Sequence, residues 1–309
     1  MRIIQDVRNC NEAFPELVLT VGSFDGLHLG HQRILDELIR RTRERSGTAA
    51  LMSLHPHPRE VFAPEHAPNI LTPEAKKRTL IEAAGVDVWF RLPFDARVAA
   101  MTPEHFLDEI VVDRCQAKEL VIGHDFTFGR DAGGDIAWLE RVAPARGILV
   151  HEVPALYVDG ERVSSTAIRE RILQGDLEQA ARFLGRPYSI TGEVVHGRGI
   201  GVKLGFPTAN IHPHHSAVPA HGVYLAEAIL DEGVYPAAVN IGIAPTVRHD
   251  DLVIEAHLLD FHGDLTGARI EIVFHRRLRP EQKFHSREEL VTAIDADVAH
   301  VRQYFAGLS

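Results

Sequence analysis

The segment covering residues 21–32, V-G-S-F-D-G-L-H-L-G-H-Q, constrains the fold of this chain more than any other segment. It follows the apolar run at residues 17–19, which predicts a buried strand. It precedes apolar residues at helical spacing between Ile34 and Ile39. The segment is therefore predicted to be a strand-to-helix turn. In an open α/β sheet, ligands bind beside such turns, and the free N–H groups of the following helix suit a phosphate.

Two histidines stand at the start of that helix. His28 and His31 are three residues apart, so both rings can face one phosphate and donate to charge that develops on its oxygens. Gly22, Gly26 and Gly30 allow the backbone to turn sharply and approach a ligand. The alternative is that both histidines are ordinary surface residues at a helix start.

The first half of the chain alternates between strand and helix patterns. Apolar runs predict strands at residues 48–53, 86–92, 119–123 and 148–153, and helices are predicted after Thr72, Thr102 and the Gly133–Asp135 turn. This alternation predicts an α/β fold with a parallel, doubly wound sheet. The polar segment 55–60 follows a strand, so it is either a plain proline turn or part of the ligand site. The segment 123–129 also follows a strand.

A second phosphate-facing segment is predicted at residues 163–169. Ser164 is a plausible N-cap, and Arg169 follows one turn into the helix. On its own this would be an unremarkable capped helix. Together with residues 21–32 it predicts a triphosphate held from two sides.

The pattern changes near residues 185–187, which we interpret as a boundary between domains 1–185 and 186–309. Short strands without intervening helices are predicted beyond it, at residues 188–195, 222–230, 234–241, 253–259 and 268–278. Such a set predicts a small antiparallel β-barrel. A final helix is predicted from Ser286, where Glu289 completes a capping box.

Residues 197–210 form a glycine-rich segment inside the predicted barrel. We expect no helix after it, because Pro207 interrupts, and no strand-helix-strand unit surrounds it, so a dinucleotide-binding fingerprint is rejected. A flap over a nucleotide fits better, with Thr208 and Asn210 as oxygen ligands for Mg²⁺. The alternative is a glycine-rich loop with a proline turn.

Glu255 lies in the predicted strand at residues 253–259. Strand alternation places Val253, Glu255 and His257 on one face. A carboxylate there is either a solvated outer-face group, which is the commoner case, or a base that accepts a hydroxyl proton.

Composition narrows the class of protein. The 309 residues suggest two domains, and a formal net charge of −10 argues against a nucleic-acid or anionic-membrane binder. Cys10 and Cys115 have no metal spacing and favour a reducing, cytoplasmic compartment. We find no signal peptide and no apolar run of the ~18 residues that a membrane helix needs. The histidine clusters at 55–57 and 212–215 lack partners at metal-ligand spacing.

Over nearly its whole length the chain resembles the prokaryotic bifunctional riboflavin kinase/FAD synthetases. The motifs that carry the resemblance are G-x-F-D-G-x-H-x-G-H, H-P-H-P, G-x-D-F-x-F-G, S-S-T-x-I-R, G-F-P-T-A-N and the glutamate in its strand, in that order along the chain. The resemblance implies an N-terminal FMN adenylyltransferase and a C-terminal riboflavin kinase. It also implies ATP and Mg²⁺ as cosubstrate and cofactor, and riboflavin, FMN and FAD as substrates or products.

The resemblance also implies roles for individual residues. In the adenylyltransferase, His28 and His31 are catalytic, and ATP binds at Gly22, Phe24, His28, His31, Ser164, Thr166 and Arg169. Flavin binds there at His57, Asp125 and Phe128. In the kinase, Glu255 is the base, ATP and Mg²⁺ bind at Gly201, Lys203, Thr208 and Asn210, and Thr208 and Asn210 are the metal ligands. Ser23, Val202, Thr266 and Ala293 depart from the family pattern, and none of them removes a proposed catalytic group.

Two other readings compete with this one. A nucleotidyltransferase for pantetheine phosphate or nicotinamide mononucleotide would share the first half but not the barrel with Pro207–Asn210. A flavin-binding regulatory protein would keep the fold without turnover, and the presence of His28, His31 and Glu255 argues against it. The oligomeric state is not predicted.

Overall fold

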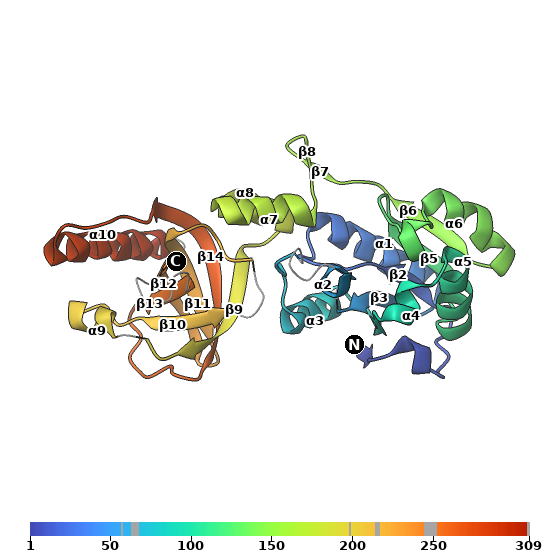
Figure 1. Cartoon of the computed structure of the whole chain (residues 1–309), viewed down its shortest axis with the longest axis horizontal. Coiled ribbons are helices and arrows are strands. Elements are labelled where there is room, and N and C mark those ends of the chain that lie inside the picture. Colours follow the sequence, from blue (N-terminus) through green and yellow to red (C-terminus); the bar gives the residue numbers. More distant parts are fainter. Residues whose placement is uncertain (57, 63–67, 198, 214–216, 244–251, 308–309) are drawn as a thin grey trace. The chain divides into compact units, whose positions relative to one another are not determined.

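The structure is a computed structural model that describes residues 1–56, 58–62, 68–197, 199–213, 217–243 and 252–307 (Figure 1). The chain divides into two compact units. The first unit comprises Met1–Pro68 and Glu74–Ser164, and the second comprises Asn69–Pro73 and Ser165–Ser309. Each unit has its own sheet and its own core.

The first unit is built on a six-stranded parallel sheet, as predicted. The strand order is β1-β4-β3-β2-β5-β6. The strands span β1 (Arg2–Ile4), β2 (Val18–Val21), β3 (Ala49–His55), β4 (Val88–Pro93), β5 (Glu119–Gly123) and β6 (Leu149–Val153). The sequence did not predict β1, because its three residues lie in a stretch of mixed polarity. A two-stranded hairpin, β7 (Tyr157–Val158) and β8 (Glu161–Arg162), precedes the end of the unit.

Helices connect the strands of this sheet, and two separate apolar clusters fill the unit. The helices are η1 (Val7–Asn9), α1 (Leu29–Arg45), α2 (Pro58–Phe62), α3 (Glu74–Ala83), α4 (Ala96–Ala99), α5 (Pro103–His105), η3 (Phe106–Arg114), η4 (Arg130–Ala132), α6 (Ile136–Val142) and η5 (Ala143–Arg146). The helix predicted after Asp135 forms as α6, and the Asp135 carboxylate caps it by accepting the N–H of Trp138 at 2.8 Å. The inner strands β2, β3, β4 and β5 are buried along most of their length because both faces of the sheet are covered there.

The strand order reverses at β2. The chain passes from β2 to β3 and β4 on one side, and then returns to add β5 on the other side of β2. The turn after Val21 therefore leaves the sheet at its topological switch point, where ligands bind in this type of fold.

The second unit contains a closed six-stranded barrel with the order β10-β13-β12-β11-β14-β9. Its strands are β9 (Tyr188–Val195), β10 (Ala209–Pro213), β11 (Gly222–Leu230), β12 (Gly233–Ile243), β13 (Leu252–Leu258) and β14 (Arg269–Pro280). All neighbouring strands are antiparallel, as predicted. Two helices, α7 (Ser165–Gln174) and α8 (Leu177–Leu184), precede the barrel, and α10 (Arg287–Ala306) follows it.

The terminal helix packs on the barrel through Val301, which is fully buried in a cluster with Leu225, Ala238 and Leu259. Ser286 caps α10, as predicted, by accepting the N–H of Glu289 at 3.1 Å. The reciprocal half of the capping box differs from the prediction. The Glu289 carboxylate accepts the N–H of His285, not that of Ser286, at 2.9 Å.

The glycine-rich segment contains two elements that the sequence did not predict. The short helix α9 (Ile200–Leu204) forms ahead of Pro207, and the strand β10 begins at the end of the segment. Since α9 is one turn long and leads into an antiparallel strand, the segment still forms no strand-helix-strand unit. The rejection of a dinucleotide fingerprint therefore stands on topology.

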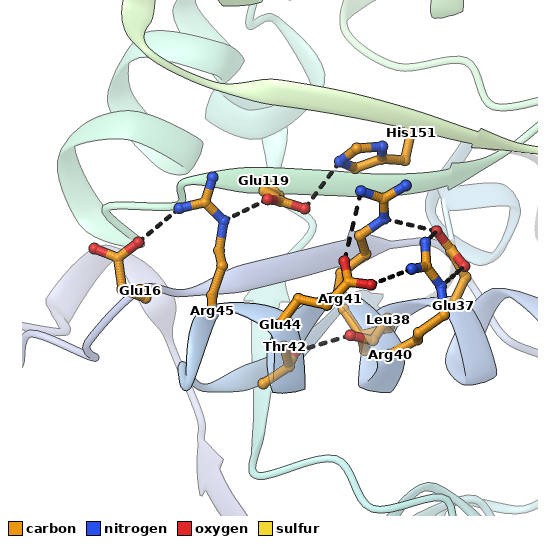
Figure 2. A network of polar contacts seen from close by, with 10 residues as sticks. All are labelled: Glu16, Glu37, Leu38, Arg40, Arg41, Thr42, Glu44, Arg45, Glu119 and His151. Atoms are coloured by element: carbon orange, nitrogen blue, oxygen red, sulfur yellow. Dashed lines mark hydrogen bonds and ion pairs between the residues drawn. The ribbon is translucent and has the colours of Figure 1, made fainter.

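A network of charged side chains lies beside the first sheet, between α1, β5 and β6 (Figure 2). Arg45 on α1 pairs with the buried carboxylate of Glu119 and, at 2.7 Å, with the exposed carboxylate of Glu16. Nε2 of His151 lies 2.8 Å from the second oxygen of Glu119. Because Glu119 is the first residue of β5, its ion pairs lie at the amino end of that strand, opposite to the turn after β2.

Candidate active sites

The turn after β2 brings its backbone into the left-handed region at three residues. The φ angles are 48° at Phe24, 90° at Gly26 and 40° at Leu27. Glycine adopts such angles without a steric penalty, whereas phenylalanine and leucine do not. The Phe24 and Leu27 side chains are both 2 % exposed and belong to one core cluster, so packing holds the turn in this shape.

The turn ends at His28, which is the N-cap of α1. Nδ1 of His28 accepts the backbone N–H of His31 at 3.2 Å. An imidazole nitrogen thus takes the place of the usual serine or aspartate oxygen at this cap. The cap fixes the orientation of the His28 ring relative to the first turn of α1.

The two predicted histidines lie together. Their rings stack with centroids 3.7 Å apart and planes 14° apart, and the His31 ring also packs on Phe24, at 4.9 Å. The pKa of His31 lies well below its ordinary value, first because the ring is buried and then because His28 and Lys77 are near. His31 is therefore neutral at physiological pH. Its Nδ1 is buried without a hydrogen-bond partner among the described residues.

The predicted flavin-binding residues follow β5. Phe128 packs against the rings of Phe106, Phe126 and Trp138, with centroids 5.4 to 5.7 Å apart. Asp125 is exposed, and Arg162 on β8 pairs with its carboxylate. His57 lies outside the described residues.

The predicted ATP-binding residues near α7 are divided between the units. Ser164 ends the first unit, and Thr166 and Arg169 lie on α7 in the second. A Cβ placed on Gly30 would lie 3.9 Å from the carbonyl oxygen of Val163, so the chain just before Ser164 reaches the start of α1. Nε of Arg169 donates to the carbonyl of Asn69 at 2.9 Å. A role for Thr166 and Arg169 in binding ATP stays a prediction.

In the second unit, Asn210 on β10 lies directly opposite Glu255 on β13, and Asn240 on β12 lies opposite Glu255 on its other side. Directly opposed residues of antiparallel strands share a face of the sheet. The alternating residues Ile254 and Ala256 are fully buried inside the barrel, so Glu255 and both asparagines face outward. The prediction that Val253, Glu255 and His257 share a face is confirmed by the same alternation.

The segment before β10 lies on this outer face. The His257 ring nitrogen Nδ1 lies 2.8 Å from the carbonyl oxygen of Pro207, and the ring meets Phe206 edge-on at 5.6 Å. A Cβ on Gly201 would lie 2.3 Å from the Phe206 carbonyl and 3.0 Å from Oγ1 of Thr208, so only glycine fits there. Gly201 thus brings α9 against Thr208, while the Lys203 side chain is exposed.

The oxygen-bearing side chains on this face suit a hard cation. Thr208, Asn210 and Glu255 offer a hydroxyl, an amide oxygen and a carboxylate, which are ligand types that Mg²⁺ accepts beside nucleotide phosphates. Among the described residues, no group of three or more His, Cys, Asp or Glu side chains is placed to hold a metal ion. The donor set therefore fits an ion that takes most of its ligands from the phosphates and water.

Sequence reasoning missed three residues that contact the predicted sites. Asn240 could have been found as a polar residue that interrupts an apolar strand. Arg162 and Lys77 could not have been found, because each reaches its partner from an element distant in the sequence. Arg162 on β8 pairs with Asp125, and Nζ of Lys77 on α3 donates to the carbonyl of Ser23 at 2.9 Å.

Comparison with known proteins gives two family matches. The FAD synthetase model matches residues 10–167, and the riboflavin kinase model matches residues 184–305. The bifunctional riboflavin kinase/FMN adenylyltransferase of Pseudomonas fluorescens is 40% identical over 303 residues, which cover 98% of this chain and 97% of that protein. The enzyme of the same name from Escherichia coli K12 is 36% identical over 307 residues, which cover 99% and 98%.

A solved structure also matches the whole chain. It is described as a macrolide-efflux protein from Streptococcus pneumoniae, and it superposes with a TM-score of 0.88 at 28% identity over 97% of this chain and 98% of that one. None of the helices in the described part of the present chain has the length and apolar character to span a membrane.

Proposed function

Because this chain belongs to the bifunctional riboflavin kinase/FMN adenylyltransferase family, whose two activities make FMN and FAD, we propose a role for each of the two sites described above. The turn after β2 carries out adenylyl transfer, and the outer face of the barrel around Glu255 carries out phosphorylation. The observation that carries this proposal is the separation of the two sets: His28 and His31 lie in the first unit, and Asn210 and Glu255 lie in the second.

In adenylyl transfer, a phosphate oxygen of FMN attacks the α-phosphorus of ATP, a new P–O bond forms, and pyrophosphate leaves. The nucleophile is already anionic, so this site needs no general base. Its task is to position the two substrates and to stabilise charge on the phosphoryl oxygens. The stacked rings of His28 and His31 can supply N–H donors for this purpose, at the amino end of α1.

In the kinase reaction, a ribityl hydroxyl of riboflavin attacks the γ-phosphorus of ATP, and ADP leaves. This nucleophile must lose a proton, and the Glu255 carboxylate accepts it. Thr208 and Asn210 would hold Mg²⁺, which when bound neutralises charge on the nucleotide phosphates. Gly201 and Lys203 would cover the nucleotide from α9.

We also propose that the chain works in the cytoplasm. Cys10 and Cys115 are both free and buried, and burial raises the pKa of the Cys115 thiol. Free thiols of this kind suit a reducing compartment.

One assay tests the proposal. The purified chain is incubated with riboflavin, ATP and MgCl₂, and flavins are separated by chromatography over time. We expect FMN to form first and FAD to follow, and neither to form when EDTA exceeds the metal. Binding of flavin without conversion would instead identify a flavin-binding regulatory protein.

A further inference from the structure

Lys77 connects α3 to the adenylyl-transfer turn. Its Nζ donates to the carbonyl oxygen of Ser23 at 2.9 Å, although the two residues are 54 positions apart in the sequence. Ser23 directly precedes Phe24, the first residue of the turn in the left-handed region. The Lys77 side chain thus holds the Ser23 carbonyl, directly before the first residue with a positive φ angle.

A second side chain holds the other end of the same turn. Nε2 of Gln32 on α1 donates to the carbonyl oxygen of Leu27 at 2.9 Å. Leu27 is the last residue with a positive φ before the N-cap His28. Both ends of residues 23–27 are therefore held by long side chains from helices, one from α3 and one from α1.

The turn needs such support because its own backbone is unfavourable. Positive φ angles at non-glycine residues are sterically unfavourable, and they persist only where the surroundings impose them. The apolar contacts of Phe24 and Leu27 in their shared core cluster supply part of that support. Residues 80 and 81 of α3 pack against the same cluster, so α3 presents Lys77 to the turn from a fixed position.

The ammonium group also lies near the histidines. Lys77 is one of the groups that lower the pKa of His31, and Asp25 and Glu74 are among the opposite charges near Lys77 itself. Movement of the turn would shift Phe24, on which the His31 ring packs, and His28, which caps α1. The position of both rings is therefore linked to the Lys77–Ser23 hydrogen bond.

We propose that Lys77 is a positioning residue for adenylyl transfer, which holds residues 23–27 in the shape that places His28 and His31. This inference rests on the proposed role of the two histidines. Positioning predicts a loss in the rate of the chemical step with little change in ATP binding, because misplacement by about 1 Å can cost on the order of 10²-fold in rate.

The test compares full-length variants in FMN adenylylation and riboflavin phosphorylation. Lys77→Met should lower kcat for adenylylation about 10- to 100-fold with KM for ATP within about threefold of wild type. Lys77→Arg keeps a charged donor and should restore kcat to within about fivefold. Arg78→Met, an exposed cation next to Lys77 on α3, should match wild type. Riboflavin phosphorylation should stay unchanged in all three.

Three results would overturn the proposal: wild-type kcat in Lys77→Met, a change confined to KM for ATP, or failure of Lys77→Arg to restore kcat. Circular dichroism at the assay temperature shows whether each variant is folded, and Lys77→Gln replaces the Met variant if the latter is not. His31→Ala is assayed in parallel. Full activity of that variant would remove the proposed histidine role itself, whatever Lys77 does.

Discussion

Asn210 and Glu255 lie opposite each other on β10 and β13, with both side chains on the outer face of the barrel. One belongs to the motif G-F-P-T-A-N and the other to a strand 45 residues later. Asn240 on β12 is the other cross-strand neighbour of Glu255. The base we propose for the kinase is thus flanked by two amides, which are fixed by strand register and not by loop conformation.

The stacked histidines give the first prediction. Replacing His31 by Ala removes a neutral imidazole that is fixed between Phe24 and His28. FMN adenylylation should fall on the order of 10²-fold or more, as expected for the loss of one transition-state donor. Riboflavin phosphorylation should remain near wild type, since that site lies in the second unit. Equal loss of both activities would contradict the assignment of two separate sites.

The predicted boundary at residue 185 can be tested with fragments. A fragment of residues 1–185 should fold and convert FMN and ATP to FAD. A fragment of residues 1–164 lacks Thr166 and Arg169 and should lose that activity, if these residues bind ATP. The helix α8 packs against β9 and β14, and Phe183 and Leu184 on it are buried, so the longer fragment exposes an apolar face. Inactive or insoluble 1–185, with the full chain active, would show that the two halves depend on each other.

The charged network of Figure 2 predicts unequal roles for two glutamates that share Arg45. The Glu119 side chain is 6% exposed and the Glu16 side chain 47%. Glu119→Gln should lower the free energy of unfolding by about 2 kcal/mol, because it weakens charged hydrogen bonds in a buried setting. Glu16→Gln should cost less than about 1 kcal/mol, as is usual for exposed pairs.

Urea or thermal unfolding of the two variants measures this difference. For a unit of this size, a loss of 2 kcal/mol corresponds to a fall in Tm of roughly 4–8 °C. Both enzymatic activities should be unchanged at temperatures where the variants are folded, because the ion pairs of Glu119 lie at the amino end of β5. Equal stability of the two variants would mean that burial of Glu119 does not strengthen its pairing.

The sequence predicted most elements because each had a local signal. Both the strand at residues 119–123 and the strand at residues 222–230 were predicted with the ends that the structure shows. The strand β10 was missed because Pro207 and the glycines before it read as loop, and its pairing with β9 and β13 is long-range. Contacts between distant segments leave no local pattern, so the motif residues could be found in the sequence but their long-range contacts could not. Neither the Asn240–Glu255 register nor the Lys77–Ser23 hydrogen bond has a local signature.

The last prediction concerns Glu255 as the kinase base. Glu255→Gln keeps the size and hydrogen-bonding reach of the side chain between Asn210 and Asn240 but removes its basicity. Base assistance contributes typically ~10²–10⁴-fold, so FMN formation from riboflavin should fall by that order while the affinity for ATP changes little. FMN supplied directly should still become FAD at the wild-type rate, because adenylyl transfer uses the other unit.

The matched control is Glu193→Gln, which changes an exposed carboxylate on β9 of the same barrel. That variant should phosphorylate riboflavin at the wild-type rate, which separates loss of the base from a general loss of negative charge. Both variants are assayed with riboflavin and with FMN as the starting flavin, and products are resolved by chromatography. If Glu255→Gln phosphorylates riboflavin within a few fold of wild type, Glu255 is not the base, and it is a solvated carboxylate on the outer face of the barrel.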